Sequence, residues 1–149
     1  MSLGQVKRQW KADTDHDRYR RGMYTFFFRA TPHPALSVFD APDSFSACSR
    51  RPRSNTPLQA LTLLNDEGFF ELAEALARRT LAECTGTENE RLEHLFRLCL
   101  GRPPAAKELP PLRRLLQTER SAAPDAPEAT AWVSLARVAL NLDETITRE

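Results

Sequence analysis

A run of alternating aspartates is the first group whose residue types could bind an ion. Asp13, Asp15 and Asp17 alternate as the first ligands of a calcium loop do. Such a loop also needs glycine at its sixth position and an acidic residue at its twelfth. The sequence has Arg18 and Tyr24 at these positions, which favours a solvated acidic turn over a calcium site.

Cysteine and histidine side chains give a second candidate for metal chemistry. Cys84, His94 and Cys99 lack the two closely spaced ligand pairs that zinc sites use, and Cys99 lies on an apolar helical stripe that favours a core position. The sequence contains no Cys-x-x-Cys-His haem motif, no Gly-x-Ser-x-Gly and no glycine-rich phosphate loop. We therefore predict no metal site, no catalytic residue and no cofactor on this chain.

The densest basic cluster consists of Arg50, Arg51 and Arg53. It precedes the amino end of a predicted helix, which attracts anions, so a sulfate, phosphate or carboxylate group could bind there. The alternative, which we favour, is structural pairing of these arginines with Asp40 and Asp43 or with helix C-terminal carbonyls. The two aspartates could also form a catalytic pair, but capping and arginine pairing are simpler uses of them.

Two capping boxes mark the clearest helix starts. Thr56 is a predicted N-cap, Pro57 occupies the first helical position and Gln59 can reach back to the cap. Thr87 and Glu90 form the second box. Each box satisfies backbone N–H groups that a helix would otherwise leave unpaired, so we expect ordered helices after both.

Apolar stripes place further helices along the second half of the chain. The segment Asn65-Asp66-Glu67 resembles another cap that restarts or bends the first of them. Gly101 is expected to end a helix in the left-handed conformation. The apolar positions that define these helices are Leu58, Leu61 and Leu64; Phe69, Phe70, Ala73, Leu76, Ala77 and Leu81; Leu92, Leu95, Phe96, Cys99 and Leu100; Leu112, Leu115 and Leu116; and Trp132, Leu135, Ala136, Ala139 and Leu140.

Upstream, the aromatic segment from Arg18 to Arg29 favours a helix over a buried strand, stopped by Pro32 and Pro34. Residues 31–55 then predict a long ordered loop. The fold class is therefore all-α, an irregular bundle of about five to six helices. We expect a polar extension over 1–17 and a single helical domain over 18–149.

Charge is divided unevenly between the two parts of the chain. Residues 1–55 carry ten basic and five acidic side chains, a net charge of +5, and residues 56–149 carry eleven and fifteen, a net charge of −4. We favour neutralisation within one fold over nucleic-acid binding, because the interleaving of basic and aromatic residues that single-strand binders use appears in no more than one segment. No apolar run reaches the ~18–20 residues of a membrane span, so no membrane insertion is expected.

Several short sequence strings are more distinctive than the chemistry of their residue types alone explains. In order along the chain they read YRRGMYTF (19–26), FDAPD (39–43), RSNTPLQAL (53–61), LND (64–66), LGRPP (100–104) and LNLDE (140–144). Together they resemble the carboxy-terminal part of a planctomycete-specific domain of unknown function, which lies carboxy-terminal to cytochrome-c-like domains in large surface or periplasmic proteins. The family usually has a tryptophan near Phe27 or Phe28, where this chain has none. Cys48 lies slightly away from the position at which the family pattern has its cysteine, and its role stays open.

The resemblance implies a location outside the cytoplasm, in the periplasm or at the cell surface. It also implies partners among the other domains of a parent protein, including a cytochrome-c-like module, and it transfers no catalytic residue. The first hypothesis is a non-enzymatic structural or interaction module, with self-association through an exposed apolar face as a further expectation. The alternatives are part of a hydrolytic or redox enzyme whose site needs the missing amino-terminal segment, and anion or sulfated-polysaccharide binding by the arginine cluster.

Overall fold

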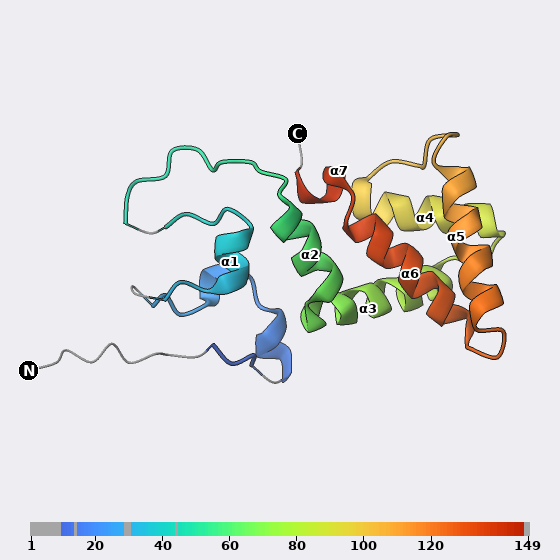
Figure 1. Cartoon of the computed structure of the whole chain (residues 1–149), viewed down its shortest axis with the longest axis horizontal. Coiled ribbons are helices and arrows are strands. Elements are labelled where there is room, and N and C mark those ends of the chain that lie inside the picture. The colour runs from blue at the N-terminus through green and yellow to red at the C-terminus, as the bar shows by residue number, and fades with distance from the viewer. Residues whose placement is uncertain (1–9, 14, 29–30, 44, 148–149) are drawn as a thin grey trace, which may run out of the picture. The chain divides into compact units, whose positions relative to one another are not determined.

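The computed structural model describes residues 10–13, 15–28, 31–43 and 45–147. The part of the chain that it describes is all-α and contains no β-strand, as the sequence predicts (Figure 1). The α-helices are α1 (Pro34–Val38), α2 (Pro57–Asn65), α3 (Glu67–Glu83), α4 (Glu88–Leu100), α5 (Leu109–Ala122), α6 (Glu128–Leu140) and α7 (Asp143–Ile146).

The chain divides into two compact units, with the boundary between Ser54 and Asn55. In the first unit, α1 follows two 3-10 helices, η1 (Asp15–Tyr19) and η2 (Gly22–Tyr24). The second unit contains α2 to α7. The expectation of a single helical domain over 18–149 stays a prediction.

The core of the second unit lies where α3, α4, α5 and α6 pack together. Helices α3 and α6 contact each other along much of their lengths, and both present alanines there, which lets two helices approach closely. Trp132 is fully buried on α6, and its indole N–H donates to Glu128 at 3.0 Å, so the ring is buried without losing its hydrogen bond. The buried positions are Ala73, Ala77, Leu92, Leu95, Phe96, Cys99, Leu112, Leu116, Ala131, Trp132, Leu135, Ala136 and Ala139.

Helices α2 and α3 are separated by a single residue, Asp66. Its backbone is extended, with φ −74° and ψ 133°, and its carboxylate accepts hydrogen bonds from the N–H groups of Gly68 and Phe69. The side chain therefore caps α3 at the point where α2 ends. The expected restart of the helix at Asn65-Asp66-Glu67 is confirmed.

Helix α4 ends as the sequence predicts, at a glycine in the left-handed conformation. Gly101 has φ 74°, and its N–H donates to the carbonyl of Arg97. Helix α5 begins at Leu109, with Pro110 and Pro111 in its first turn. Prolines are tolerated there because N–H groups in the first turn have no partner within the helix.

The helix expected from Arg18 to Arg29 is not present among the described residues 18–28. Two separate 3-10 turns, η1 and η2, occur instead, and Thr25 is extended with ψ 132°. The rings of Phe26 and Phe28 lie 4.7 Å apart, whereas the ring of Phe27 contacts Phe45 at 6.1 Å. Three consecutive phenylalanines cannot share one face of a helix, but alternation along extended backbone sends the middle ring to the opposite side.

Candidate functional site

The predicted arginine and aspartate cluster lies in the first unit, on the loop that follows α1. Arg51 donates from Nε to the carbonyl of Asp40 at 3.1 Å and from Nη2 to the carbonyl of Phe39 at 2.9 Å. Phe39 is the C-cap of α1, and Asp40 has a left-handed backbone with φ 56°. The guanidinium therefore binds carbonyls at a helix C-terminus, one of the two structural roles that the sequence left open.

Both aspartates of the cluster accept hydrogen bonds from nearby backbone. The Asp40 carboxylate accepts from the N–H of Ser54 at 3.0 Å and from its hydroxyl at 2.6 Å, which closes the loop between them. Asp43 accepts from the N–H groups of Phe45 at 3.0 Å and Ser46 at 3.3 Å. The Phe45 bond contributes most to holding the pKa of Asp43 below its usual value. The structure thus places both side chains in turn-forming positions. A direct ion pair between either carboxylate and an arginine guanidinium stays a prediction.

Arg50 and Arg53 are placed differently from Arg51. Both side chains are exposed, and neither makes a hydrogen bond or ion pair with another described residue. The three arginines of the cluster are therefore not equivalent. One is used to hold the loop, and two are available to solvent.

Both capping boxes are present. Thr56 accepts from the N–H of Gln59 at 3.3 Å, and the Gln59 side chain accepts from the N–H of Thr56 at 2.9 Å. Thr87 and Glu90 repeat this exchange at α4. The N–H of Thr87 is the main reason that the pKa of Glu90 lies below its usual value. These four residues therefore have structural roles at helix starts.

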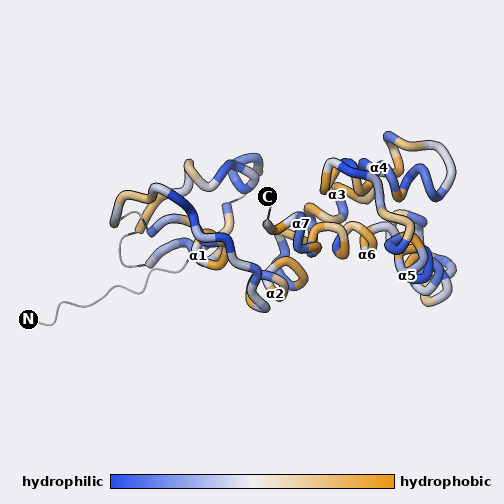
Figure 2. Tube along the Cα trace, turned by 90° about the horizontal axis from the view of Figure 1, so that it is seen from above, coloured by the Kyte–Doolittle hydropathy of each residue, from blue (hydrophilic) through white to orange (hydrophobic). Residues whose placement is uncertain are grey.

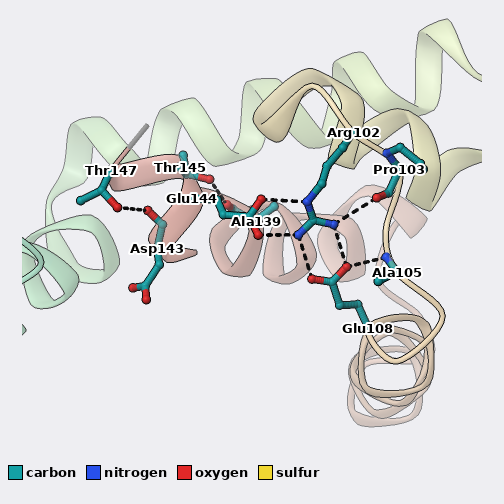
Figure 3. Close-up of polar contacts among 9 residues, drawn as sticks. All are labelled: Arg102, Pro103, Ala105, Glu108, Ala139, Asp143, Glu144, Thr145 and Thr147. Carbon is teal, nitrogen blue, oxygen red and sulfur yellow. Dashed lines mark hydrogen bonds and ion pairs between the residues drawn. The ribbon is translucent and has the colours of Figure 1, made fainter. Parts of the chain in front are cut away.

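Arg102, just after Gly101, forms an extensive polar cluster with residues of α5 and α7 and their flanks (Figure 3). Its Nε and Nη2 donate to the two carboxylate oxygens of Glu144 at 2.8 and 2.6 Å, and its Nη1 and Nη2 donate to those of Glu108, both at 2.9 Å. Nη1 also donates to the carbonyl of Pro103 at 3.1 Å. These bonds use all five N–H donors of the guanidinium, so none is left for an external anion.

The charges of this cluster stabilise one another. The hydrogen bonds from Arg102 lower the pKa of Glu108 to about 2, and they also hold the pKa of Glu144 below its usual value. The pKa of Arg102 is raised, first by Glu144 and then by Glu108. The cluster is ionised across the physiological range and acts as a fixed link, not as an acid or base.

The same link joins several strings of the sequence. Glu144 belongs to α7, whose Asp143 accepts a hydrogen bond from the amide of Asn55 just before α2. The hydroxyl of Thr145 donates to the carbonyl of Ala139 in α6 at 2.7 Å. Strings that are distant in sequence, at 53–61, 100–104 and 140–144, therefore meet through α7. The string that contains Arg102 is distinctive in the sequence, but nothing in the sequence marks this arginine as the centre of the junction.

A second arginine, Arg120, lies at a hollow between the end of α5 and the start of α6. Arg120 donates from Nη1 to Glu88 at 2.7 Å and also pairs with Glu128. The hollow has a volume of about 370 Å³. Its lining residues are Glu119, Arg120, Ala122, Ala123, Pro124, Ala126, Pro127, Glu128, Thr130 and Ala131. The hydrogen bond from Arg120 holds the pKa of Glu128 below its usual value, so these two charges at the hollow are paired with each other.

The part of the chain that the structure describes offers neither a cluster of metal ligands nor a membrane-spanning helix. No group of three or more His, Cys, Asp or Glu side chains in this part of the chain is placed to hold a metal ion. Among the helices that the structure describes, none combines the length and the apolar character that crossing a bilayer requires.

The comparisons with known proteins gave one match. The family model described as PSD1, protein of unknown function (DUF1553), matches residues 1–116. Neither the curated proteins nor the solved structures gave a significant match to the chain.

Proposed function

Because the chain belongs to the PSD1 family of proteins of unknown function (DUF1553), we propose that it is a non-catalytic helical module of a larger planctomycete protein. In this proposal the module lies outside the cytoplasm and packs beside a cytochrome-c-like module of the same protein. The observation that carries the proposal is the Arg102 junction, in which every guanidinium N–H binds another group of the same unit.

The hydrogen-bond partners of the acidic residues in these strings favour a scaffolding role over a catalytic one. A catalytic acid or base needs a pKa near the working pH and access to substrate. Glu108 instead has its pKa lowered to about 2, and that of Asp43 is lowered by backbone N–H groups. Residues with these partners hold helices and turns in place, which is what a packing module needs.

Direct binding tests this function. The purified chain would be titrated with a separately expressed cytochrome-c-like domain from a planctomycete protein of the same architecture, and heat would be followed by calorimetry. We expect saturable binding, and we expect a haem-free mutant of the cytochrome domain that retains its fold to bind equally, since the contact is structural. No binding at the highest soluble concentrations would contradict the partner.

The location needs a separate measurement. Periplasmic, cytoplasmic and membrane fractions of the source cells would be probed with an antibody raised against the chain. Recovery with periplasmic or surface markers is expected. Recovery with cytoplasmic markers alone would contradict the extracytoplasmic location, whatever the result of the binding experiment.

A second candidate function is anion binding by the first unit. Its specific observation is that Arg50 and Arg53 are exposed and make no hydrogen bond or ion pair with another described residue. Sulfated polysaccharide is the candidate ligand, because sulfate groups match exposed guanidinium groups.

Retention on heparin resin tests this candidate. Replacing both arginines by serine should lower the salt concentration of elution, because each lost charge weakens a salt-sensitive attraction. Replacing Lys107 and Arg114 together by serine is the matched control, since this also removes two exposed positive charges but in the second unit. Equal shifts for the double variant and the control would show that net charge alone sets the retention, and would contradict a specific anion site at Arg50 and Arg53.

A further inference from the structure

Helix α2 is rich in leucine but contributes none of its leucines to the core. Leu58, Leu61, Leu63 and Leu64 all lie within its nine residues. None of them belongs to the buried cluster of the second unit or to the partly buried side chains packed against it. The one buried side chain of the helix is polar, Gln59.

Two of these leucines are largely open to solvent. Leu58 is 58% exposed and Leu61 is 56% exposed, one helical turn apart on the same face. Figure 2 shows the hydrophobic colouring along α2. Paired leucines at this spacing form the kind of apolar stripe that helices normally bury against another helix.

The helix is fixed in place despite this exposure. Its amino end has the Thr56–Gln59 capping box, and at its carboxyl end the carbonyl of Leu64 accepts a hydrogen bond from Arg137 Nη2 at 2.7 Å. It also packs against α3 and α6. The exposed stripe is therefore carried by an ordered helix, so little ordering entropy opposes its binding to a partner.

Charge points to the identity of that partner. The segment from Ser54 to Asn65 contains no charged residue, in a chain where 28% of residues are charged. A twofold contact between identical surfaces places like charges near each other, so a charged face resists self-pairing whereas a charge-free face does not. A charge-free stripe also offers nothing for a charged partner to complement.

We propose that α2 pairs with α2 of a second copy of this chain, across a twofold axis, with Leu58 and Leu61 at the centre of the contact. A twofold axis perpendicular to the helices makes them antiparallel, so each helix N-terminus lies near the C-terminus of the other, which the helix dipoles favour. One short helix per copy buries less than the ~800 Å² per partner of a standard interface, so the dimer is weak. The inference goes beyond the proposed function, because it holds or fails whether or not a cytochrome-c-like module binds.

Analytical ultracentrifugation of the full chain over a wide concentration range tests the pairing. We expect a reversible monomer–dimer equilibrium for the unchanged chain. Leu61→Glu and Leu61→Lys should each weaken the dimer by about tenfold or more, because each places two like charges at the twofold contact. An equal mixture of the two variants should recover the dimer, since opposite charges then face each other.

The controls separate the contact from the fold. Leu72→Glu makes the same change at another exposed leucine, on α3, and should leave the equilibrium unchanged. Circular dichroism should give the same helical content for all variants. A monomeric unchanged chain, a dimer unaffected by both Leu61 variants, or dissociation without recovery in the mixture would each overturn the pairing of α2 with itself.

Discussion

Arg102 binds both carboxylate oxygens of Glu144, at 2.8 and 2.6 Å, although the two residues are 42 positions apart in the sequence. Glu144 lies on the four-residue helix α7, which has no buried residue of its own. A helix this short is not stable in isolation, so polar contacts must hold it. The position of α7 therefore depends strongly on the Arg102 guanidinium.

The first prediction concerns the shape of that guanidinium. Arg102→Lys keeps the positive charge but cannot donate to two carboxylates and a carbonyl in a planar arrangement. We expect a lower melting temperature and faster amide exchange in α7, measured by calorimetry and by hydrogen exchange. Arg97→Lys is the control, because Arg97 forms an exposed pair with Glu93 within α4, and exposed pairs contribute little. Equal effects of the two substitutions would contradict a special role for Arg102.

The second prediction is a loss of stability in acid that depends on Glu108. Its pKa in the folded chain is about 2, below the ordinary 4.5. The unfolded chain therefore binds more protons between these values, so this contribution is complete above the unfolded pKa and is lost as the pH falls towards the folded pKa.

Urea unfolding at a series of pH values measures this dependence. Glu108→Gln should lower stability near neutral pH, where the ion pair is complete, and should make the decline in acid shallower. Some decline should remain, because the pKa of Glu144 is also lowered by Arg102. An unchanged slope in the variant would show that Glu108 has the same pKa in the folded and unfolded chains.

The third prediction isolates backbone strain at Gly101. A Cβ built at this position meets no other atom within 4 Å, so the cost of Gly101→Ala comes from its φ of 74° alone. We expect a loss of about 1 kcal/mol in the free energy of unfolding, measured by urea denaturation. Gly101→Asn should lose less, since asparagine tolerates the left-handed conformation better. Two substitutions of equal effect would argue that side-chain contacts, not backbone strain, decide the outcome.

Local signals predicted the helical part of this fold well. The boxes at Thr56 and Thr87 and the cap at Gly101 depend on residues within a few positions of one another, so their geometry is encoded in short strings. The stripe through Leu92, Leu95 and Phe96 likewise predicts which face of α4 is buried. Such features need no knowledge of the rest of the chain.

Contacts between distant residues could not be predicted in the same way. Nothing in one sequence pairs Arg102 with Glu144, because many other carboxylates were equally available. In the first unit, Trp10 lies in a stretch that has no apolar period, yet its ring contacts Phe28 at 4.9 Å and His33 at 4.8 Å. A tryptophan among polar residues is the one local sign that this stretch packs against other side chains, and it does not say which ones.

The last prediction uses the cysteines to report on the second unit. Cys99 is 7% exposed, and burial raises the pKa of its thiol to about 11, so the reactive thiolate is scarce and shielded. Cys48 is exposed, and Cys84 is half-buried. With a chromogenic disulfide reagent near neutral pH, Cys48→Ser should remove the fastest reacting thiol. Cys99 should react only at the rate of unfolding, and Cys99→Ser should remove that slow phase. Fast labelling of Cys99 in the folded chain would mean that α4 opens readily, which its packing against α3 and α6 argues against.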